Sequence, residues 1–299
     1  MMPDLISAIC VSMPSRYGFL QRAVYNFASQ DYYDRELIVA IYDEEYFGKV
    51  SSWLSSKQHV NIDLSRVRVL RTTDSHVGKQ AAEAFKATSG DFIAAWSDDN
   101  LSHARRLSSQ LAVTKDLNIA TVVSSSFYYF YDTEELYVTD YYQPGHKLSE
   151  WCSPASLITP RESFFPVALQ LSGAQSHWPS TLVHRLGYSF PNQKYHHLRD
   201  VDYGFLFMQG VGSDNQRGIE RHRKLGCRLP LTWTRDQILA RADDIDNILS
   251  GYTFPRKTVD VAGRDAAACT ISGENIHQWP DWFDSPLPAD GLTLNSEGQ

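Results

Sequence analysis

Residues 91–107 read DFIAAWSDDNLSHARRL, an apolar run that ends abruptly at two adjacent acids. The run from Phe92 to Trp96 is short and apolar, which is typical of a strand buried on both faces of a parallel sheet. Asp98 and Asp99 follow at the carboxyl end, where open α/β sheets bind their ligands. Two carboxylates there would repel a diphosphate unless a divalent cation lay between them, so the stretch indicates a metal-bridged nucleotide site. Taken alone, these acids are more often turn or helix-cap residues.

The residues before this stretch repeat a strand and helix pattern. Apolar strands are expected at 5–11, 37–41, 67–70 and 92–96, and amphipathic helices at 19–28, 46–56 and 77–88. Right-handed crossovers between such strands give a parallel sheet with helices on both faces, so the predicted fold class is α/β with a mostly parallel, Rossmann-like central sheet. No Gly-x-Gly-x-x-Gly turn follows the first strand and no Walker lysine loop occurs, so neither a dinucleotide site nor a P-loop is supported.

The pattern is less regular after a helix expected at 103–115. Antiparallel strands are expected at 121–131 and 136–139, and residues 141–180 are interpreted as rich in loops because prolines interrupt them. Helices are expected at 200–209 and 236–249, with a short strand at 228–234 between them. The remainder is interpreted as an acidic tail that contains Pro and Trp.

Charge and cysteine content exclude several classes of protein. The chain of 299 residues has a net charge of −7; residues 241–299 hold ten acids against four Lys and Arg, so they carry −6 and leave −1 for the rest. This distribution does not fit a nonspecific nucleic-acid binder. The four cysteines are widely spaced, which favours reduced thiols and a cytoplasmic location over a zinc site or a disulfide framework. The apolar runs are too short to span a bilayer, although peripheral attachment stays open.

Several short motifs follow one another in the first hundred residues. Residues 7–23 form an opening strand, a Pro-containing loop and a helix, and residues 30–38 read QDYYDRELI. Gly78-Lys79, residues 89–91 (SGD) and residues 97–100 (SDDN) then follow. In this order the motifs resemble the family 2 inverting glycosyltransferases, in particular the spore-coat polysaccharide type. The resemblance covers residues 5–110 in good order and residues 150–240 more thinly.

The resemblance implies a GT-A nucleotide-diphospho-sugar transferase fold with a smaller acceptor-side subdomain. The implied reaction moves a sugar from a nucleotide-diphosphate donor, foremost a UDP-sugar, to an acceptor hydroxyl with inversion. By position, Asp43 would contact the base, Asp98 the ribose or metal, and Asp99 would hold the Mn²⁺ or Mg²⁺ that bridges the phosphates. The family's Asp-x-Asp is here Ser97-x-Asp99, which leaves fewer carboxylates for the ion. The other expected donor-binding residues are Pro14, Arg16, Arg71, Lys79, Arg221 and Arg223.

The resemblance also implies a catalytic base in the second half of the chain. The family places a Glu-Asp pair at the start of a helix, and its Asp is the base; the match here is Arg199-Asp200. Asp200 is therefore the expected base, with Asp202 as the second choice. An Asp favoured by the helix dipole is an equally good account of this position.

Acceptor and lid residues are expected around this base. His177, Trp178 and His197 lie where the family builds its acceptor site, and aromatic faces stack on sugar rings, although packing explains them equally well. Residues 217–228 hold five Lys and Arg between glycines, which suits a lid over the donor phosphates; a solvated basic loop is the simpler account. His222 in this cluster is a candidate metal ligand.

These assignments divide the chain into a nucleotide-sugar-binding half (1–116), an acceptor-binding and catalytic half (117–240), and a C-terminal helix with the acidic tail (241–299). Two other functions stay open. A sugar nucleotidyltransferase would have a Gly-rich, Arg-containing loop after the first strand, of which only Arg16 is present. A non-catalytic sugar-nucleotide-binding scaffold would tolerate Ser97 and Arg199 in place of acids. The acceptor stays open among glycans, lipids, proteins, small molecules and, less readily, a modified nucleic acid whose phosphates contact residues 217–228.

Overall fold

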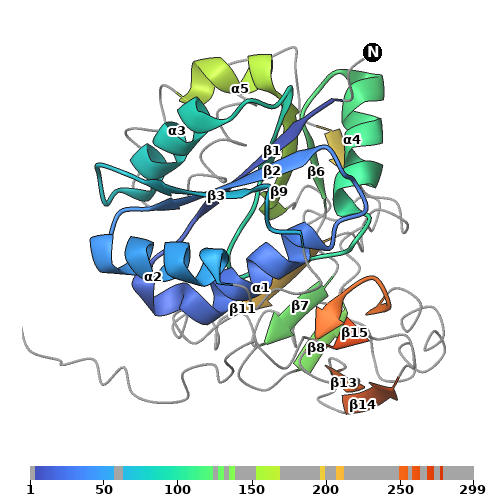
Figure 1. The fold of residues 1–299 in the computed structure, drawn as a ribbon. Coiled ribbons are helices and arrows are strands. Elements are labelled where there is room, and N and C mark those ends of the chain that lie inside the picture. Colours follow the sequence, from blue (N-terminus) through green and yellow to red (C-terminus); the bar gives the residue numbers. More distant parts are fainter. Residues whose placement is uncertain are drawn as a thin grey trace, which may run out of the picture.

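The structure is a computed structural model that describes residues 4–56, 63–123, 127–130, 135–138, 153–168, 196–198, 207–211, 249–254, 258–262, 268–272 and 277–278. In this part of the chain a helix-covered sheet lies beside a second sheet made of shorter strands (Figure 1).

The first sheet has, in the described residues, seven strands in the order β10-β6-β9-β4-β1-β2-β3. Strands β1 to β4 are parallel to one another, whereas β9 is antiparallel to both β4 and β6, and β10 is parallel to β6. The carboxyl ends of β10, β6, β4, β1, β2 and β3 therefore meet at one edge. The strands are β1 (Ile6–Val11), β2 (Arg35–Ile41), β3 (Val67–Arg71), β4 (Phe92–Ala95), β6 (Thr121–Val123), β9 (Ser153–Pro160) and β10 (His196–Leu198).

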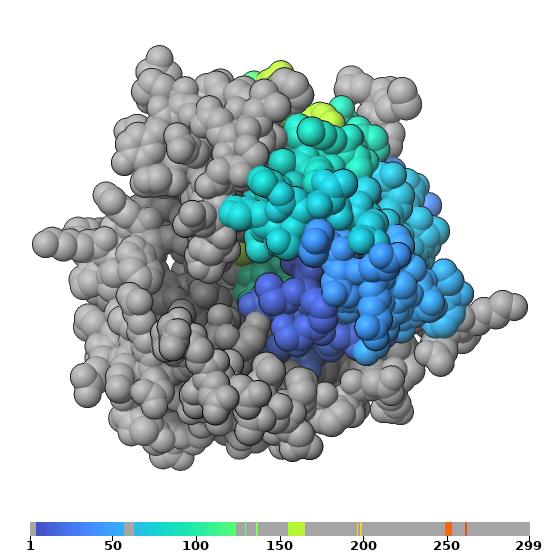
Figure 2. Space-filling model, turned by 90° about the vertical axis from the view of Figure 1, so that its left-hand side faces the viewer, coloured from blue at the N-terminus to red at the C-terminus, as the bar shows by residue number. Residues whose placement is uncertain are grey.

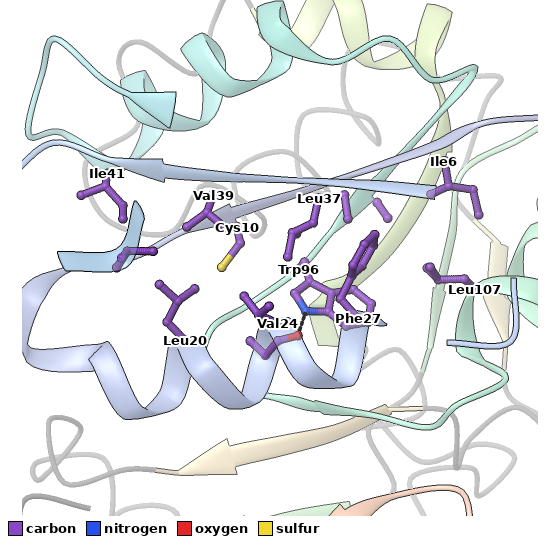
Figure 3. Close-up of a cluster of buried hydrophobic side chains, with 14 of the residues drawn as sticks. Ile6, Cys10, Leu20, Val24, Phe27, Leu37, Val39, Ile41, Trp96 and Leu107 are labelled. Carbon is purple, nitrogen blue, oxygen red and sulfur yellow. Dashed lines mark hydrogen bonds between the residues drawn. The ribbon is translucent and has the colours of Figure 1, made fainter. Parts of the chain in front are cut away.

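Helices cover both faces of this sheet (Figure 1). Because neighbouring residues of a strand point to opposite faces, each face has its own core. Leu37, Val39 and Ile41 pack with α1, α2 and α4 in one core, whereas Ile38 and Ala40 pack with α3 and α5 in the other. Figure 3 shows part of the first core. The helices are α1 (Tyr17–Ala28, after the short 3-10 helix η1 at Pro14–Arg16), α2 (Glu44–Ser55), α3 (Val77–Ala87), α4 (Arg106–Leu117) and α5 (Arg161–Ala168).

The second sheet collects segments that are far apart in the sequence. Its described strands have the order β14-β13-β8-β7-β11-β5, and β12 pairs separately with β15. Strand β5 directly follows the turn after β4, so the chain passes from the first sheet into the second within a few residues. The strands are β5 (Leu101–Ser102), β7 (Phe127–Phe130), β8 (Glu135–Val138), β11 (Phe207–Val211), β12 (Thr253–Phe254), β13 (Thr258–Ala262), β14 (Ala268–Ser272) and β15 (His277–Gln278).

The predicted fold class is confirmed, and the four parallel strands with their three crossover helices lie where the sequence places them. The antiparallel pairing of β7 with β8 is also confirmed. The expected strand at 121–131 instead divides into β6 and β7, which belong to different sheets. In the described residues no helix is long and apolar enough to cross a membrane.

Three other expectations for the second half were wrong. Residues 207–209 belong to strand β11 and not to a helix, because pairing with β5 and β7 overrides the local apolar spacing; residues 200–206 lie outside the described residues. Within 141–180, β9 and α5 replace the expected loops, since Pro154 and Pro160 stand near the ends of β9, where a strand tolerates proline. The expected acidic tail contains strands β12 to β15. The division of the chain at residues 116 and 240 stays a prediction, as do the elements expected at 228–234 and 236–248, which lie outside the described residues.

Candidate functional site

Asp98 and Asp99 lie in the turn that joins the two sheets, at the carboxyl edge of β4. The residue before this turn, Trp96, is buried and fixes its base. Its backbone N–H donates to Ile9 O (3.0 Å), and its indole Nε1 donates to Ala23 O (2.9 Å; Figure 3). The hydrophobic core therefore holds the acid-bearing turn in place from beneath.

Arg16 contacts both acids. Its Nη1 lies 2.8 Å from Asp98 Oδ1 and 3.1 Å from Asp99 Oδ2. The loop that brings it there follows β1, with Pro14 at the start of η1 and the N–H of Arg16 donating to Met13 O (2.9 Å). The side chains of Arg16, Asp98 and Asp99 are only 19%, 2% and 14% exposed, so these ion pairs are shielded from water.

The charge on Asp98 is incompletely compensated. Its Oδ2 is buried without a hydrogen-bond partner in the described residues. The pKa of Asp98 is raised to about 6, chiefly by burial; the neighbouring Asp99 contributes to the rise, whereas Arg16 and the Ser12 hydroxyl oppose it. A buried carboxylate with an unused oxygen and a raised pKa makes Asp98 a candidate ligand-binding residue.

Ser97 has a definite role in this turn, because its hydroxyl donates to Asp99 Oδ1. The residue that replaces the first acid of the family motif therefore orients the last one. Asp99 Oδ2 faces Arg16 at the same time, so both oxygens of Asp99 are directed by neighbouring side chains.

The acid pair fits a divalent cation if a ligand supplies the remaining oxygens. Hard cations such as Mg²⁺ bind carboxylate and phosphate oxygens, commonly through one or two protein carboxylates. Asp98 and Asp99 offer such oxygens, including the unpartnered Oδ2 of Asp98. In the part of the chain that the structure describes, no third Asp, Glu, His or Cys gathers with them, so a diphosphate would have to complete the coordination.

The other described donor-site candidates, Asp43, Arg71 and Lys79, lie along the same edge and each has a partner of its own. Asp43 is exposed and caps α2, with its Oδ1 accepting from Tyr46 N (2.8 Å). Arg71, at the end of β3, donates from Nε to Tyr42 O (2.8 Å) and so lies against the loop that carries Asp43. Lys79, in the first turn of α3, pairs with Asp74 (2.5 Å).

Further unsatisfied polar atoms follow β3 at the same edge. Thr72 Oγ1, His76 Nδ1 and Gln80 Oε1 are buried and have no hydrogen-bond partner among the described residues. Figure 2 shows this face, where green atoms lie recessed between the dark blue N-terminal segment and the cyan atoms around β3 and α3. Donors and acceptors left open at this edge suit a polar ligand.

The remaining predicted residues lie outside the described residues: Asp200, Asp202, Arg221, Arg223, His222, His177 and Trp178. His197 is in β10, but its side chain is not among those described. The described flanks of the expected base are informative. Leu198 ends β10 at the carboxyl edge of the first sheet, and Phe207 in β11 pairs with Ser102 in β5, just beyond the acid pair.

Three supporting residues were missed by the sequence analysis. Ser12 and Tyr46 bring their hydroxyls within 3.1 Å of each other behind Asp98. Arg106 is buried, donates to Ala95 O (2.9 Å) and lies over the Trp96 ring (4.9 Å to its centre). Ser12 directly follows β1, and this position at the carboxyl edge could have identified it as a candidate. Arg106 lies near the start of an expected helix, and nothing in the local sequence indicates that it is buried.

Of the comparisons with known proteins, the one with solved structures supports the fold. No protein-family model and no curated protein matches the chain. Among solved structures, the mannosyltransferase PcManGT from Pyrobaculum calidifontis, in complex with GDP-Man and Mn²⁺, is similar with a TM-score of 0.50 at 12% identity, over 82% of this chain and 65% of that one. S. aureus TarS 1-349 in complex with UDP gives a TM-score of 0.49 at 12% identity, over 73% and 63%. The matched region thus spans less than two thirds of the mannosyltransferase chain and of the UDP complex of TarS 1-349, and the chain shares its α/β fold with the mannosyltransferase.

Proposed function

We propose that this protein is a glycosyltransferase that moves a sugar from a nucleoside-diphosphate donor, foremost a UDP-sugar, to an acceptor hydroxyl. The observation that carries the proposal is the convergence of Asp98, Asp99 and Arg16 at the carboxyl edge of β1 and β4. Ligands of open α/β sheets bind at this edge, and carboxylates with an arginine beside them suit a diphosphate bound with a cation. The solved structures of similar fold include proteins with UDP or with GDP-Man and Mn²⁺.

The finer assignments rest on the sequence motifs. Membership of family 2, the spore-coat type and inversion all follow from the resemblance of residues 5–110, and the cytoplasmic location from the four widely spaced cysteines. The acceptor class stays open. In the proposed site Asp43 and Arg71 serve the nucleoside end of the donor, whereas Arg16 and the acid pair serve the diphosphate.

The described flanks support Asp200 as the base. Leu198, two residues before Asp200 in the sequence, ends β10 at the carboxyl edge of the first sheet. Strands β10 and β4 are three positions apart in the sheet, or about 14 Å, which leaves room for a donor and an acceptor between the ends of these two strands. Asp202 is five residues before Phe207 and stays the second choice.

In the proposed reaction, the acceptor oxygen attacks the anomeric carbon as the bond to the diphosphate breaks. The acceptor proton passes to the Asp200 carboxylate, and the electron pair of the broken bond leaves with the nucleoside diphosphate. A divalent cation, when bound, would neutralise charge on that leaving group. Asp99 would hold the cation in the orientation that Ser97 sets, and Arg16 would donate to phosphate oxygens.

The first test measures nucleotide binding by thermal shift. UDP, GDP, ADP and CDP would each be added with and without Mn²⁺ to the wild type, Asp99→Asn and Asp91→Asn. Asp91 is the matched control, since it lies at the opposite end of β4 and accepts from Leu5 N (3.2 Å). We expect UDP with Mn²⁺ to raise the Tm of the wild type and of Asp91→Asn, and to raise that of Asp99→Asn much less.

The second test measures turnover. Release of nucleoside diphosphate from UDP-sugars, with a broad acceptor panel, should fall by at least about a hundredfold in Asp200→Asn. A fall with Asp202→Asn alone would move the base to that residue. Binding without any turnover would contradict the proposal in favour of a scaffold, and formation of nucleoside triphosphate from pyrophosphate would favour a nucleotidyltransferase.

A further inference from the structure

We propose that Arg16 acts as an internal cation that competes with the divalent metal ion for Asp98 and Asp99. On this view the donor diphosphate draws Arg16 away from the acid pair and so opens the pair to the metal. The role of the diphosphate rests on the proposed function. The competition between Arg16 and the metal does not, and it can be tested without any nucleotide.

The geometry of the ion pairs is the first argument. A single nitrogen, Nη1 of Arg16, lies 2.8 Å from Asp98 Oδ1 and 3.1 Å from Asp99 Oδ2, and so occupies the space between the two carboxylates. A metal ion that binds a carboxylate oxygen lies about 2.0–2.6 Å from it. Metal and guanidinium would then be close neighbours of like charge in a shielded site, where their repulsion is strong.

The second argument concerns which partner can move. The acids are fixed, because Trp96 holds their turn from the core and Ser97 orients Asp99. Arg16 instead extends from a three-residue 3-10 helix whose residues Pro14 and Ser15 are exposed. A long arginine side chain has several rotamers through which it can leave the acids, whereas the short aspartate side chains stay with the turn that carries them.

The third argument is the partner that Arg16 would gain. Arginine binds phosphate oxygens through its fork of N–H groups, often in a bidentate manner. A diphosphate at the carboxyl edge would replace two carboxylates with a partner of similar charge, and the metal would then take the place that Arg16 leaves. By linkage, a nucleotide that promotes metal binding is itself bound more tightly when the metal is present.

The test titrates Mn²⁺ alone and follows free Mn²⁺ by electron paramagnetic resonance. The variants are Arg16→Ala, Arg16→Gln and Lys115→Ala. Lys115 is the charge-matched control, because it pairs with Asp4 at the amino edge of the first sheet, away from the acid pair. We expect both Arg16 variants to bind Mn²⁺ about tenfold more tightly than the wild type, and Lys115→Ala to stay within about twofold. Adding Asp99→Asn to Arg16→Ala should remove the gain.

Two results would overturn the competition. One is an Arg16→Ala or Arg16→Gln protein that binds Mn²⁺ no better than the wild type while its circular dichroism shows a normal fold. The other is an equal gain in Lys115→Ala, which would mean that net charge alone sets the affinity.

A repeat of the titration with saturating UDP tests the release step. UDP should increase Mn²⁺ affinity by a larger factor in the wild type than in Arg16→Ala, because only the wild type has an arginine to displace. Equal factors would refute the release by diphosphate. Failure of UDP to bind any of these proteins would count against the proposed function, and the nucleotide-free titration would still decide the competition.

Discussion

The two edges of the first sheet each hold a buried carboxylate, and the protein compensates the two charges very differently. At the amino edge, Glu36 accepts hydrogen bonds from Ser7 Oγ (2.6 Å), Ser89 N (2.7 Å), Ser89 Oγ (2.9 Å) and Arg68 Nη2 (2.8 Å). Burial disfavours its charge, but these bonds outweigh it and lower the pKa of Glu36. At the carboxyl edge, burial dominates and raises the pKa of Asp98. A fully satisfied carboxylate stabilises the fold, whereas an under-satisfied one costs stability that a ligand can restore.

The largest expected effect comes from Arg106, whose guanidinium donates hydrogen bonds to buried acceptors just beneath the carboxyl edge. Its guanidinium donates to Ala95 O (2.9 Å), Ala155 O (3.2 Å) and Ser102 Oγ (3.0 Å), and so joins β4, β9 and β5. Burial lowers the pKa of Arg106 to about 9, which still leaves it charged at neutral pH. Arg106→Met should lower the free energy of unfolding by about 3–5 kcal/mol, because it leaves buried acceptors without their donor.

Urea denaturation measures this loss, and Arg105→Met is the matched control because Arg105 is the exposed neighbour on the same turn. A loss under about 1 kcal/mol would show that apolar packing alone holds the carboxyl edge. Hydrogen bonding by Arg106 would then not explain how the carboxyl edge is stabilised.

At the amino edge, Glu36→Ala should cost about 3 kcal/mol, since it leaves Ser7 Oγ and the Ser89 N–H without their acceptor. The wild-type contribution of Glu36 has a definite pH dependence. Because the folded pKa is lowered, this stability is present above the unfolded pKa, ordinarily near 4.5, and is lost as the pH falls through the folded pKa.

Denaturation of the wild type and Glu36→Ala between pH 7 and pH 3 checks both points. Glu44→Ala serves as the control, because the Glu44 side chain is 84% exposed and its ion pair with Arg71 (3.3 Å) should contribute little. If Glu36→Ala and Glu44→Ala lost the same free energy of unfolding, the buried carboxylate would contribute no more to stability than the exposed one.

At both edges the sequence predicts the strands but not the side-chain contacts between them. The strands that end at Val11, Ile41 and Ala95 contain apolar runs, so their parallel direction and the placement of Asp98 and Asp99 at the carboxyl edge follow from local pattern. The Arg16 contact does not follow, because it joins residues 82 and 83 positions apart across a loop. The hydrogen bonds of Glu36 to Ser7 and Ser89 are equally non-local.

Long-range pairing explains the errors in the second half as well. Strand β11 forms between β5 and β7, and β13 forms between β8 and β14, so each depends on segments that lie far away in the sequence. A five-residue stretch such as Phe207–Val211 has apolar spacing that suits either a helix or a strand. Only its neighbours in the sheet decide, and a local pattern does not identify them.

Gly90 lies at the amino edge, where the backbone of β1 leaves no room for a larger side chain. A Cβ on Gly90 would lie 2.5 Å from Leu5 O and 2.7 Å from Ser7 N, which are backbone atoms that cannot move without disturbing β1. Gly90→Ala should therefore cost about 2 kcal/mol in urea denaturation. Gly48→Ala is the counterpart, since nothing lies within 4 Å of its Cβ on α2, and there we expect a gain of about 0.5 kcal/mol. A loss at Gly48 similar to that at Gly90 would show that the clash is not the cause.

At the carboxyl edge, Asp98→Asn has a smaller expected effect than the substitutions of Arg106, Glu36 and Gly90, and its sign is opposite to theirs. Asp98→Asn should raise the free energy of unfolding by about 1 kcal/mol at pH 8, because the substitution removes a buried charge whose pKa is raised to about 6 from 3.8. A raised folded pKa means that Asp98 contributes stability below pH 3.8 and loses that contribution as the pH rises through 6. The advantage of Asn should therefore be full at pH 8 and shrink as the pH falls below 6, while nucleotide binding with Mn²⁺ weakens in the variant. If Asp98→Asn lowers the stability at pH 8, the ion pair with Arg16 outweighs burial, and the acid pair would be a structural element like Glu36.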